Sequence, residues 1–298
     1  MIQFREATML CDRVNASKMI SKALLAVLVS AAFVTAAHAE PPREFQVRRT
    51  AKNVPYGVIG DPAKLKGPAP TLLIFAHGLD VMRQQPVYTE VATLLESKGW
   101  ISIIVEPPCH GEDARADEPA QLAGWRHRAE QNEPFIAAFC AKASEVLDTL
   151  VDEKITDPDR VAVCGTSRGG FLAYHFAASD PRIKATAGIS PVTRLRALRE
   201  FTTIEPADKA DQLDVAKVAS KLVGRGVWLS IGNHDLRVST DDAIAFTRAV
   251  VEASARVDQP DAVIPVELIV AAAPGHSKID QAHQRLADWL VAQLAPAK

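Results

Sequence analysis

The stretch from Arg160 to Phe176, RVAVCGTSRGGFLAYHF, constrains the fold of this chain more than any other. Its short apolar run at 161–164 is too brief for a helix and favours a buried strand. A turn follows with Ser167 at its apex and a glycine two positions to either side, and residues 171–178 have the pattern of a helix. This strand, turn and helix around G-x-S-x-G are typical of a serine presented as a nucleophile, because only glycine lets strand and helix approach so closely.

The rest of the chain alternates short apolar runs with helix-like segments. A continuous apolar run such as 71–76, TLLIFA, is typical of a parallel strand covered on both faces. The alternation predicts an α/β fold, with a mostly parallel central sheet and helices on both faces. The strands are predicted at 44–49, 56–59, 71–76, 101–105, 161–164, 183–189, 227–231 and 266–271, and the helices at 88–97, 134–152, 171–178, 241–255 and 279–294.

The first 39 residues have the features of a signal peptide. Two lysines precede an uncharged run of 15 residues at 23–37, and an Ala-His-Ala cleavage sequence follows. The run is shorter than the ~20 residues that a membrane helix needs. We therefore expect an exported protein, periplasmic or secreted, with no membrane span after cleavage. The catalytic domain would occupy 40–298, and Met19 is an alternative start because the segment before it is unusually long.

Charge and cysteine content narrow the classes of function. The formal net charge is −2 and the chain has no basic run, which argues against nucleic acid as a partner. No His/Cys cluster has the spacing of metal ligands, so we expect neither a metal nor a cofactor. In the exported part, Cys164 is expected in the core, and a Cys109–Cys140 disulfide is left open. The oligomeric state leaves no mark in the sequence.

Several polar side chains follow predicted strands directly: His77, His110, Ser167, Asp235 and His276. In parallel sheets, ligands bind beyond the carboxyl ends of the strands. We therefore expect these five residues to converge on one cleft.

Three of these residues have the chemistry of a catalytic triad. A serine hydroxyl is a poor nucleophile until a base takes its proton, and the base needs a third group to hold its tautomer. We expect Ser167 to be the nucleophile, His276 the base and Asp235 the orienting acid, in the chain order Ser, Asp, His.

Other residues compete for two of these roles. His283 is a weaker base because it lies inside the predicted closing helix. Asp241 and Asp242 are rivals of Asp235, but they are expected in the first turn of a helix, where acids suit the helix dipole.

Acyl transfer also needs donors for the developing oxyanion. We expect the backbone N–H groups of Arg168 and Leu79 to supply them. His77 is expected to brace its loop or line the pocket, and His110 to line the pocket or lie in a surface loop. The Arg168 side chain either reaches a substrate carboxylate or pairs with a local acid.

The segments 112–132 and 193–225 are candidate caps or lids over the pocket. Both are polar and irregular, and neither carries a motif that identifies a substrate. Their most distinctive side chains either recognise an anionic or sugar-linked ester or are simply solvated; these are Trp125, Arg126, Arg128 and Arg196.

Four motifs in consistent order resemble the α/β-hydrolase superfamily. They are HGL at 77–79, DPDRVAVCGTSRGG at 157–170, GNHDLRV at 232–238 and GH at 275–276. Within that superfamily the chain is most similar to the prolyl oligopeptidase and dienelactone hydrolase-like branches. The resemblance implies an α/β-hydrolase fold over roughly 70–295 and a hydrolytic activity without a cofactor.

Two departures shape the functional hypothesis. The prolyl oligopeptidase branch usually carries a β-propeller ahead of its catalytic domain, whereas only about 30 residues separate the predicted cleavage site from Thr71. Dienelactone hydrolases use a cysteine nucleophile, whereas this elbow holds Ser167. We therefore expect a serine esterase that acts on a small-molecule ester through an acyl-enzyme. A serine peptidase or amidase and a non-catalytic secreted binding module are the alternatives.

Overall fold

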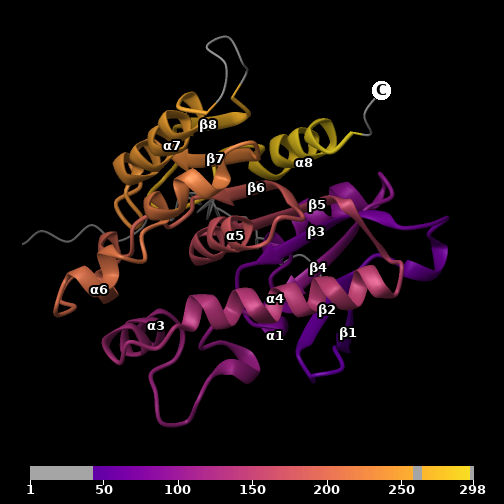
Figure 1. Ribbon diagram of the computed structural model, residues 1–298, viewed down its shortest axis with the longest axis horizontal. Helices are drawn as coiled ribbons and strands as arrows, with labels where there is room; N and C mark the ends of the chain where they lie inside the picture. The colour runs from indigo at the N-terminus through magenta and orange to yellow at the C-terminus, as the bar shows by residue number, and fades with distance from the viewer. Residues whose placement is uncertain (1–42, 258–263, 296–298) are drawn as a thin grey trace, which may run out of the picture. The chain divides into compact units, whose positions relative to one another are not determined.

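The computed structural model describes residues 43–257 and 264–295, so the predicted signal peptide at 1–39 lies outside the described residues. Within them, the strands form one sheet in the order β1-β2-β4-β3-β5-β6-β7-β8 (Figure 1). The strands are β1 (Gln46–Arg49), β2 (Pro55–Ile59), β3 (Ala69–Phe75), β4 (Ile101–Val105), β5 (Thr156–Thr166), β6 (Ile183–Ile189), β7 (Gly226–Gly232) and β8 (Val266–Ala271).

The sheet is mostly parallel, as predicted. β1 and β2 pair antiparallel at one edge, and the strands from β4 to β8 pair parallel with one another. In the centre, Leu73 of β3 lies opposite Ile103 of β4 and Val163 of β5. Because the parallel strands all run one way, the loops that follow them gather at one end of the sheet.

Helices connect the strands and cover the sheet (Figure 1). The α-helices are α1 (Leu79–Gln84), α2 (Glu90–Glu96), α3 (Gln121–Glu130), α4 (Phe135–Asp152), α5 (Arg168–Ser179), α6 (Asp208–Asp211), α7 (Thr240–Ala255) and α8 (Ala282–Gln293). The 3₁₀ helices are η1 (Pro62–Lys64), η2 (Pro86–Tyr88), η3 (Gly111–Asp113), η4 (Leu195–Ala197), η5 (Arg199–Phe201) and η6 (Val215–Leu222).

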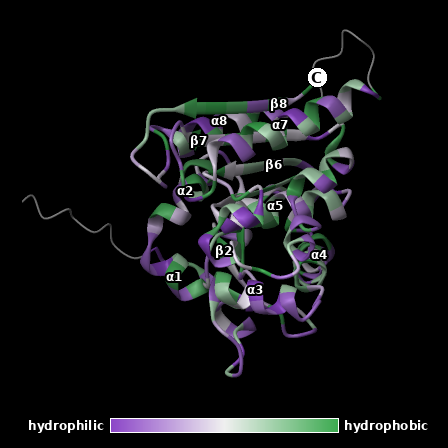
Figure 2. Ribbon diagram, turned by 90° about the vertical axis from the view of Figure 1, so that its left-hand side faces the viewer, coloured by the Kyte–Doolittle hydropathy of each residue, from purple (hydrophilic) through white to green (hydrophobic). Residues whose placement is uncertain are grey.

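The hydrophobic core has two layers, one on each face of the sheet. Successive side chains of a strand point to opposite faces, and Val163 accordingly packs with residues of α3, α4, α5 and α7. Its neighbours Ala162 and Cys164 pack with residues of α1, α2 and α8 on the other face. Hydrophobic and hydrophilic residues alternate along α4 and α7 (Figure 2), as expected of helices with one buried face. The predicted helices on both faces are confirmed.

Three local differences from the predicted elements have physical causes. Residues 121–130, expected in a loop, form α3, because Trp125 is buried in the core and its indole N–H donates to Pro108 O at 2.7 Å. Residues 156–160, which precede the predicted strand at 161–164, already belong to β5, since Thr156 pairs with Ala69 of β3. The HGL sequence opens the short helix α1, which the pattern did not indicate.

Cys109, Cys140 and Cys164 are buried free thiols, so the Cys109–Cys140 bridge is not formed. Burial raises the pKa of the Cys140 thiol to about 11. Within 43–257 and 264–295, no helix has both the length and the apolar character needed to cross a bilayer.

Candidate active site

Ser167 lies on a strained backbone between β5 and α5. Its φ of 54° and ψ of −114° are a conformation that residues other than glycine rarely adopt. The peptide groups around it are fixed, since the Ser167 N–H donates to Ile189 O and its C=O accepts from Val192 N, both at 3.0 Å. A strained serine at the end of a central strand is the geometry that the G-x-S-x-G pattern predicts.

The two glycines of the motif are required by close packing. A Cβ atom at Gly169 would lie 1.6 Å from the carbonyl oxygen of Phe75, at the end of β3. A Cβ atom at Gly165 would lie 2.1 Å from the carbonyl carbon of Gly169. Any larger residue would push α5 away from the sheet, and Ser167 would move with it.

Ser167, His276 and Asp235 form a chain of hydrogen bonds. His276 Nε2 lies 3.0 Å from Ser167 Oγ, and His276 Nδ1 lies 2.8 Å from Asp235 Oδ2. The carboxylate accepts from Nδ1–H, which leaves the Nε2 lone pair for the serine proton. Residues 41 and 109 positions apart along the chain therefore meet with the geometry of a nucleophile, a base and an orienter.

Asp235 is held rigidly for this role. It is 1 % exposed, and its Oδ1 accepts from the backbone N–H groups of Arg237 at 3.0 Å and Val238 at 3.3 Å. Its Oδ2 is thus left for His276. The loop after β7 is closed further by Thr240 Oγ1, which donates to Gly232 O at 2.7 Å.

The rival residues are engaged elsewhere. Asp241 and Asp242 lie in the first turn of α7, as expected, and the Asp242 N–H donates to Ser239 Oγ at 3.1 Å. His283 lies in α8 and contacts Glu90 Oε2 through Nδ1 at 2.7 Å. Burial lowers the pKa of His283. None of the three approaches Ser167 in the way that His276 does.

Of the two expected oxyanion donors, one N–H is free within the described residues and the other is already hydrogen-bonded. Arg168 is the first residue of α5, where a backbone N–H has no intrahelical partner. The Leu79 N–H, in contrast, donates to Glu106 Oε1 at 2.8 Å, which corrects the expectation that it is free for an oxyanion. The physical reason is that Glu106 follows β4, the neighbour of β3, so its carboxylate reaches the first N–H group of α1. Only the Arg168 N–H remains of the two expected donors.

A cavity of about 360 Å³ opens at the triad. Ser167, Arg168, His276, His77 and Tyr88 are among its lining residues. His77 Nδ1 accepts from the Gly78 N–H at 3.0 Å, and burial and the charge of Arg168 lower the pKa of His77. The side chain of His77 therefore both braces its loop and borders the cavity.

His110 does not line the cavity at the triad but lies next to it, behind His77. It is buried and borders a neighbouring cavity of about 260 Å³, to which His77 also belongs. The His77 and His110 rings meet edge to face with centroids 4.8 Å apart. Burial lowers the pKa of His110 to about 4, so the ring is neutral near pH 7. The surface-loop alternative for His110 is wrong.

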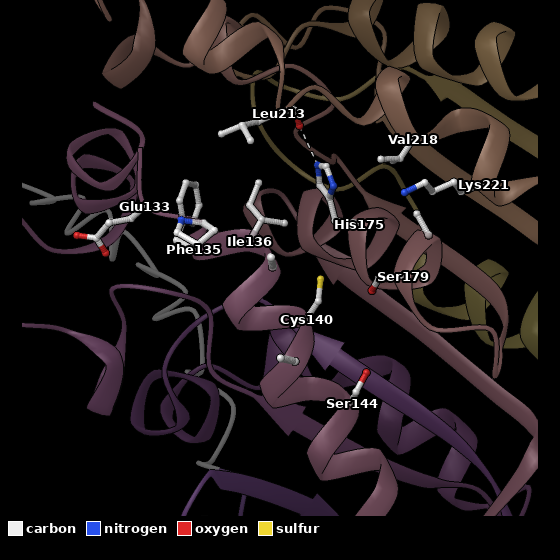
Figure 3. A pocket seen from close by; sticks show the side chains of 14 residues that line it. Glu133, Phe135, Ile136, Cys140, Ser144, His175, Ser179, Leu213, Val218 and Lys221 are labelled. Atoms are coloured by element: carbon white, nitrogen blue, oxygen red, sulfur yellow. Dashed lines mark hydrogen bonds between the residues drawn. The ribbon is translucent and has the colours of Figure 1, made fainter. Parts of the chain in front are cut away.

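A second large cavity lies between α4 and α5 and has no triad residue. Its volume is about 510 Å³, and Figure 3 shows His175, Cys140 and Ser144 on its walls. His175 Nε2 lies 2.8 Å from Leu213 O rather than near a nucleophile. Greater volume alone does not make this cavity the site of acyl transfer.

The three arginines singled out in the two irregular segments are paired with acids, although Arg126 and Arg196 remain partly exposed to solvent. Arg128 is buried and binds Asp113 and Glu118, Arg126 binds Glu130, and Arg196 contacts Asp211. Sequence inspection missed Tyr88, which borders the cavity, and Gln121, which binds Arg168. The contact between Gln121 and Arg168 could not be predicted, because Gln121 is the first residue of α3 and this helix was not expected. In the described residues, no group of three His, Cys, Asp or Glu could hold a metal ion.

Comparison with known families matches the second half of the chain. Residues 142–296, more than half of the sequence, match the prolyl oligopeptidase family, and the matched part contains Ser167, Asp235 and His276. Comparison with curated proteins gives no significant match.

Solved structures share the fold at low identity. Dipeptidyl peptidase 4 of Porphyromonas gingivalis has a TM-score of 0.59 at 18% identity, covering 85% of this chain and 35% of its own. A puromycin-hydrolyzing peptidase of Mycobacterium tuberculosis has 0.64 at 17%, covering 85% and 39%. Acetyl xylan esterase 1 of Thermoanaerobacterium sp. JW/SL YS485 has 0.61 at 13%, covering 85% and 89%. The chain thus spans little more than a third of the two peptidases. These likenesses establish the α/β-hydrolase fold.

Proposed function

The chain belongs to the prolyl oligopeptidase family, a family of serine hydrolases, and we propose that it cleaves carboxylic esters through Ser167. The observation that carries the proposal is the hydrogen-bonded chain from Ser167 through His276 to Asp235. These contacts join the cavity to a buried carboxylate, which is the arrangement that activates a serine hydroxyl.

The first half of the reaction uses all three residues. Ser167 Oγ attacks the ester carbonyl while His276 Nε2 takes its proton, and Asp235 stabilises the imidazolium that forms. The oxyanion of the tetrahedral intermediate accepts from the backbone N–H of Arg168, a donor typically worth ~3 kcal/mol in the transition state. His276 then gives the proton to the leaving alcohol, and the acyl group stays on Ser167.

The second half reverses these roles with water. His276 takes a proton from a water molecule, the hydroxide attacks the acyl-enzyme, and Ser167 leaves with the returned proton. His276 must be neutral to accept these protons.

One structural comparison supports ester substrates, and the family match supports peptide or amide substrates instead. The fold covers 89% of acetyl xylan esterase 1, which makes a small-ester hydrolase a fitting model. The family match favours a serine peptidase or amidase on the same triad as the second candidate. Rates on an ester and an anilide with the same acyl group would separate the two.

Active-site labelling tests the proposed function directly. A fluorophosphonate probe should label the wild-type chain at Ser167, and Ser167→Ala should lose both labelling and ester hydrolysis, the latter by roughly 10⁴-fold or more. The control is Ser144→Ala, because Ser144 borders the cavity without triad residues and donates to Asp180. A wild-type chain that neither labels nor hydrolyses esters would instead support a non-catalytic binding module.

We also propose that the protein is exported and begins near Glu40. The support is the charged start, the uncharged run and the Ala-His-Ala sequence of the first 39 residues. Intact-mass measurement of the exported protein tests this proposal, since residues 19–39 would still be present if no cleavage occurred.

A further inference from the structure

The Arg168 side chain is held by two uncharged partners. Its Nη1 lies 2.7 Å from His110 Nε2 and 2.9 Å from Gln121 Oε1. Both N–H bonds of Nη1 are thereby used, while the three N–H bonds of Nε and Nη2 have no hydrogen-bond partner in the part of the chain that the structure describes. The free edge is the fork with which an arginine binds a carboxylate.

The protonation of His110 fixes this arrangement. Its Nδ1 lies 2.7 Å from Pro108 O, a group that can only accept, so Nδ1 carries the proton. Because the ring is neutral near pH 7, Nε2 presents a lone pair to the guanidinium. His110 thus orients Arg168 without neutralising it.

No carboxylate neutralises Arg168 either. Among residues 43–257 and 264–295, no acid forms an ion pair with it, whereas Arg237 nearby binds Glu200 at 2.8 Å. Burial lowers the pKa of Arg168 against the smaller opposing effects of Tyr88 and Glu200, so the surroundings on balance disfavour its charge. A half-buried cation with only neutral partners is stabilised when an anion binds to it.

Arg168 faces the same cavity as the triad. It follows Ser167 directly and lines the cavity with His276 and Tyr88. Its charge also acts on His77, another lining residue, so the guanidinium lies beside the space that a substrate would occupy. One free edge matches one planar carboxylate. Among the residues that the structure describes, no second unpaired cation contacts Arg168 to balance a doubly charged phosphate.

We propose that the substrates are esters that carry a free carboxylate near the scissile bond, and that the Nε and Nη2 atoms of Arg168 bind this carboxylate. The proposal rests on the proposed esterase function and names the substrate class of that site. It also answers the question left by the sequence, because Arg168 does not pair with a local acid.

Matched pairs of esters test the proposal. One pair is p-nitrophenyl hydrogen glutarate and its neutral methyl ester, with the charge on the acyl side. The other is 4-acetoxybenzoate and its methyl ester, with the charge on the alcohol side. Each ratio of kcat/KM, charged over neutral, is divided by the ratio of the uncatalysed rates. We expect at least one ratio to favour the charged ester by about 10-fold or more, as charge-assisted hydrogen bonds typically do.

Substitution assigns the preference to Arg168. Arg168→Gln should lower the favoured ratio by about 10-fold or more, mainly through the KM of the charged ester. Arg248→Gln, which removes one charge from the exposed face of α7, should leave the ratio unchanged. If Arg168→Gln does not fold, Arg168→Lys is measured in its place. We expect it to lower the favoured ratio as well, because lysine keeps the charge but cannot form the two parallel hydrogen bonds of a guanidinium.

The outcomes separate this proposal from the proposed function. A wild-type chain that labels with the fluorophosphonate and hydrolyses both members of each pair equally would overturn the carboxylate proposal alone. Equal losses on charged and neutral esters in Arg168→Gln would overturn it as well, since they indicate a role in the oxyanion hole or in folding. Absence of labelling and of all hydrolysis would overturn the proposed function.

Discussion

At the scale of single residues, this site depends on side chains whose freedom is removed by their neighbours. Asp235 is buried, accepts two backbone N–H groups through Oδ1 and has only Oδ2 left for His276. His276 therefore has one preferred tautomer, with its lone pair toward Ser167. The strained backbone of Ser167 holds its Oγ 3.0 Å from His276 Nε2.

Replacing Asp235 tests the tautomer argument. Asp235→Asn should lower kcat by about 10⁴-fold while the protein stays folded, because an amide donor in place of an acceptor favours the wrong tautomer of His276. Kinetics on an activated ester and a thermal melt would measure both effects. Asp241→Asn is the matched control, since that residue lies on the exposed start of α7. A loss below 10-fold in Asp235→Asn would mean that another group orients His276.

At the scale of elements, the contact between α5 and the end of β3 sets the position of the nucleophile. Gly169 lets the first turn of α5 lie against Phe75. On the same face of the sheet as α5, α3 is joined to the 112–118 loop by Arg128, whose side chain is 4 % exposed. The first contact is steric and the second is electrostatic.

Enlarging Gly169 should break the elbow. In Gly169→Ala, the new methyl group would lie 1.6 Å from the Phe75 oxygen, and we expect a loss of about 3 kcal/mol or more in unfolding free energy. Chemical denaturation measures this loss. Gly67→Ala, where nothing lies within 4 Å of the new atom, should change stability little. Similar stability of the two variants would contradict the packing argument.

Removing the buried arginine should loosen α3. Arg128→Ala would leave Glu118, whose side chain is 2 % exposed, with only its longer 3.6 Å contact to Arg115, at a cost of about 3 kcal/mol. Hydrogen exchange should then accelerate in residues 112–130 before the rest of the domain. For comparison, Lys64→Ala removes a 3.4 Å pair with Asp61 on the surface and should cost at most about 1 kcal/mol.

At the scale of the whole molecule, burial couples stability to pH. Burial lowers the pKa of both His110 and His175 to about 4, below the ordinary value of 6.5. Between these values the unfolded chain binds more protons than the folded one, so unfolding free energy falls as the pH is lowered from about 6.5 to about 4. Asp214 acts in the opposite sense, because burial raises its pKa to about 6.

The His110 contribution can be measured by difference. At pH 5, His110 should reduce the unfolding free energy by about 2 kcal/mol relative to pH 7. His110→Gln keeps an acceptor for Arg168 and removes the titrating ring, so its stability should fall less than that of the wild type over this range. Denaturation at both pH values gives the difference. An equal fall in both proteins would show that His110 is not held neutral.

Much of the fold was predictable because its signals are local. Strand periodicity and continuous apolar runs identified β4, β6 and β8 at their observed bounds. The helix α3 was missed since its polar and apolar residues are mixed without a clear period, and it depends on the burial of Trp125 and the pairing of Arg128. Such contacts are made across the chain and leave no periodic pattern.

The sequence by itself determined the α/β alternation, the elbow at Ser167 and the order of Ser167, Asp235 and His276, because each depends on residue type and on position after a strand. Only the tertiary structure decided which polar groups remain free. The Leu79 N–H donates to Glu106, 27 residues away. The Arg168 side chain is bound by His110 and Gln121, 58 and 47 residues away. The physical reason is that a hydrogen bond between distant segments depends on how neighbouring strands end in space. The order of residues along the chain does not specify that.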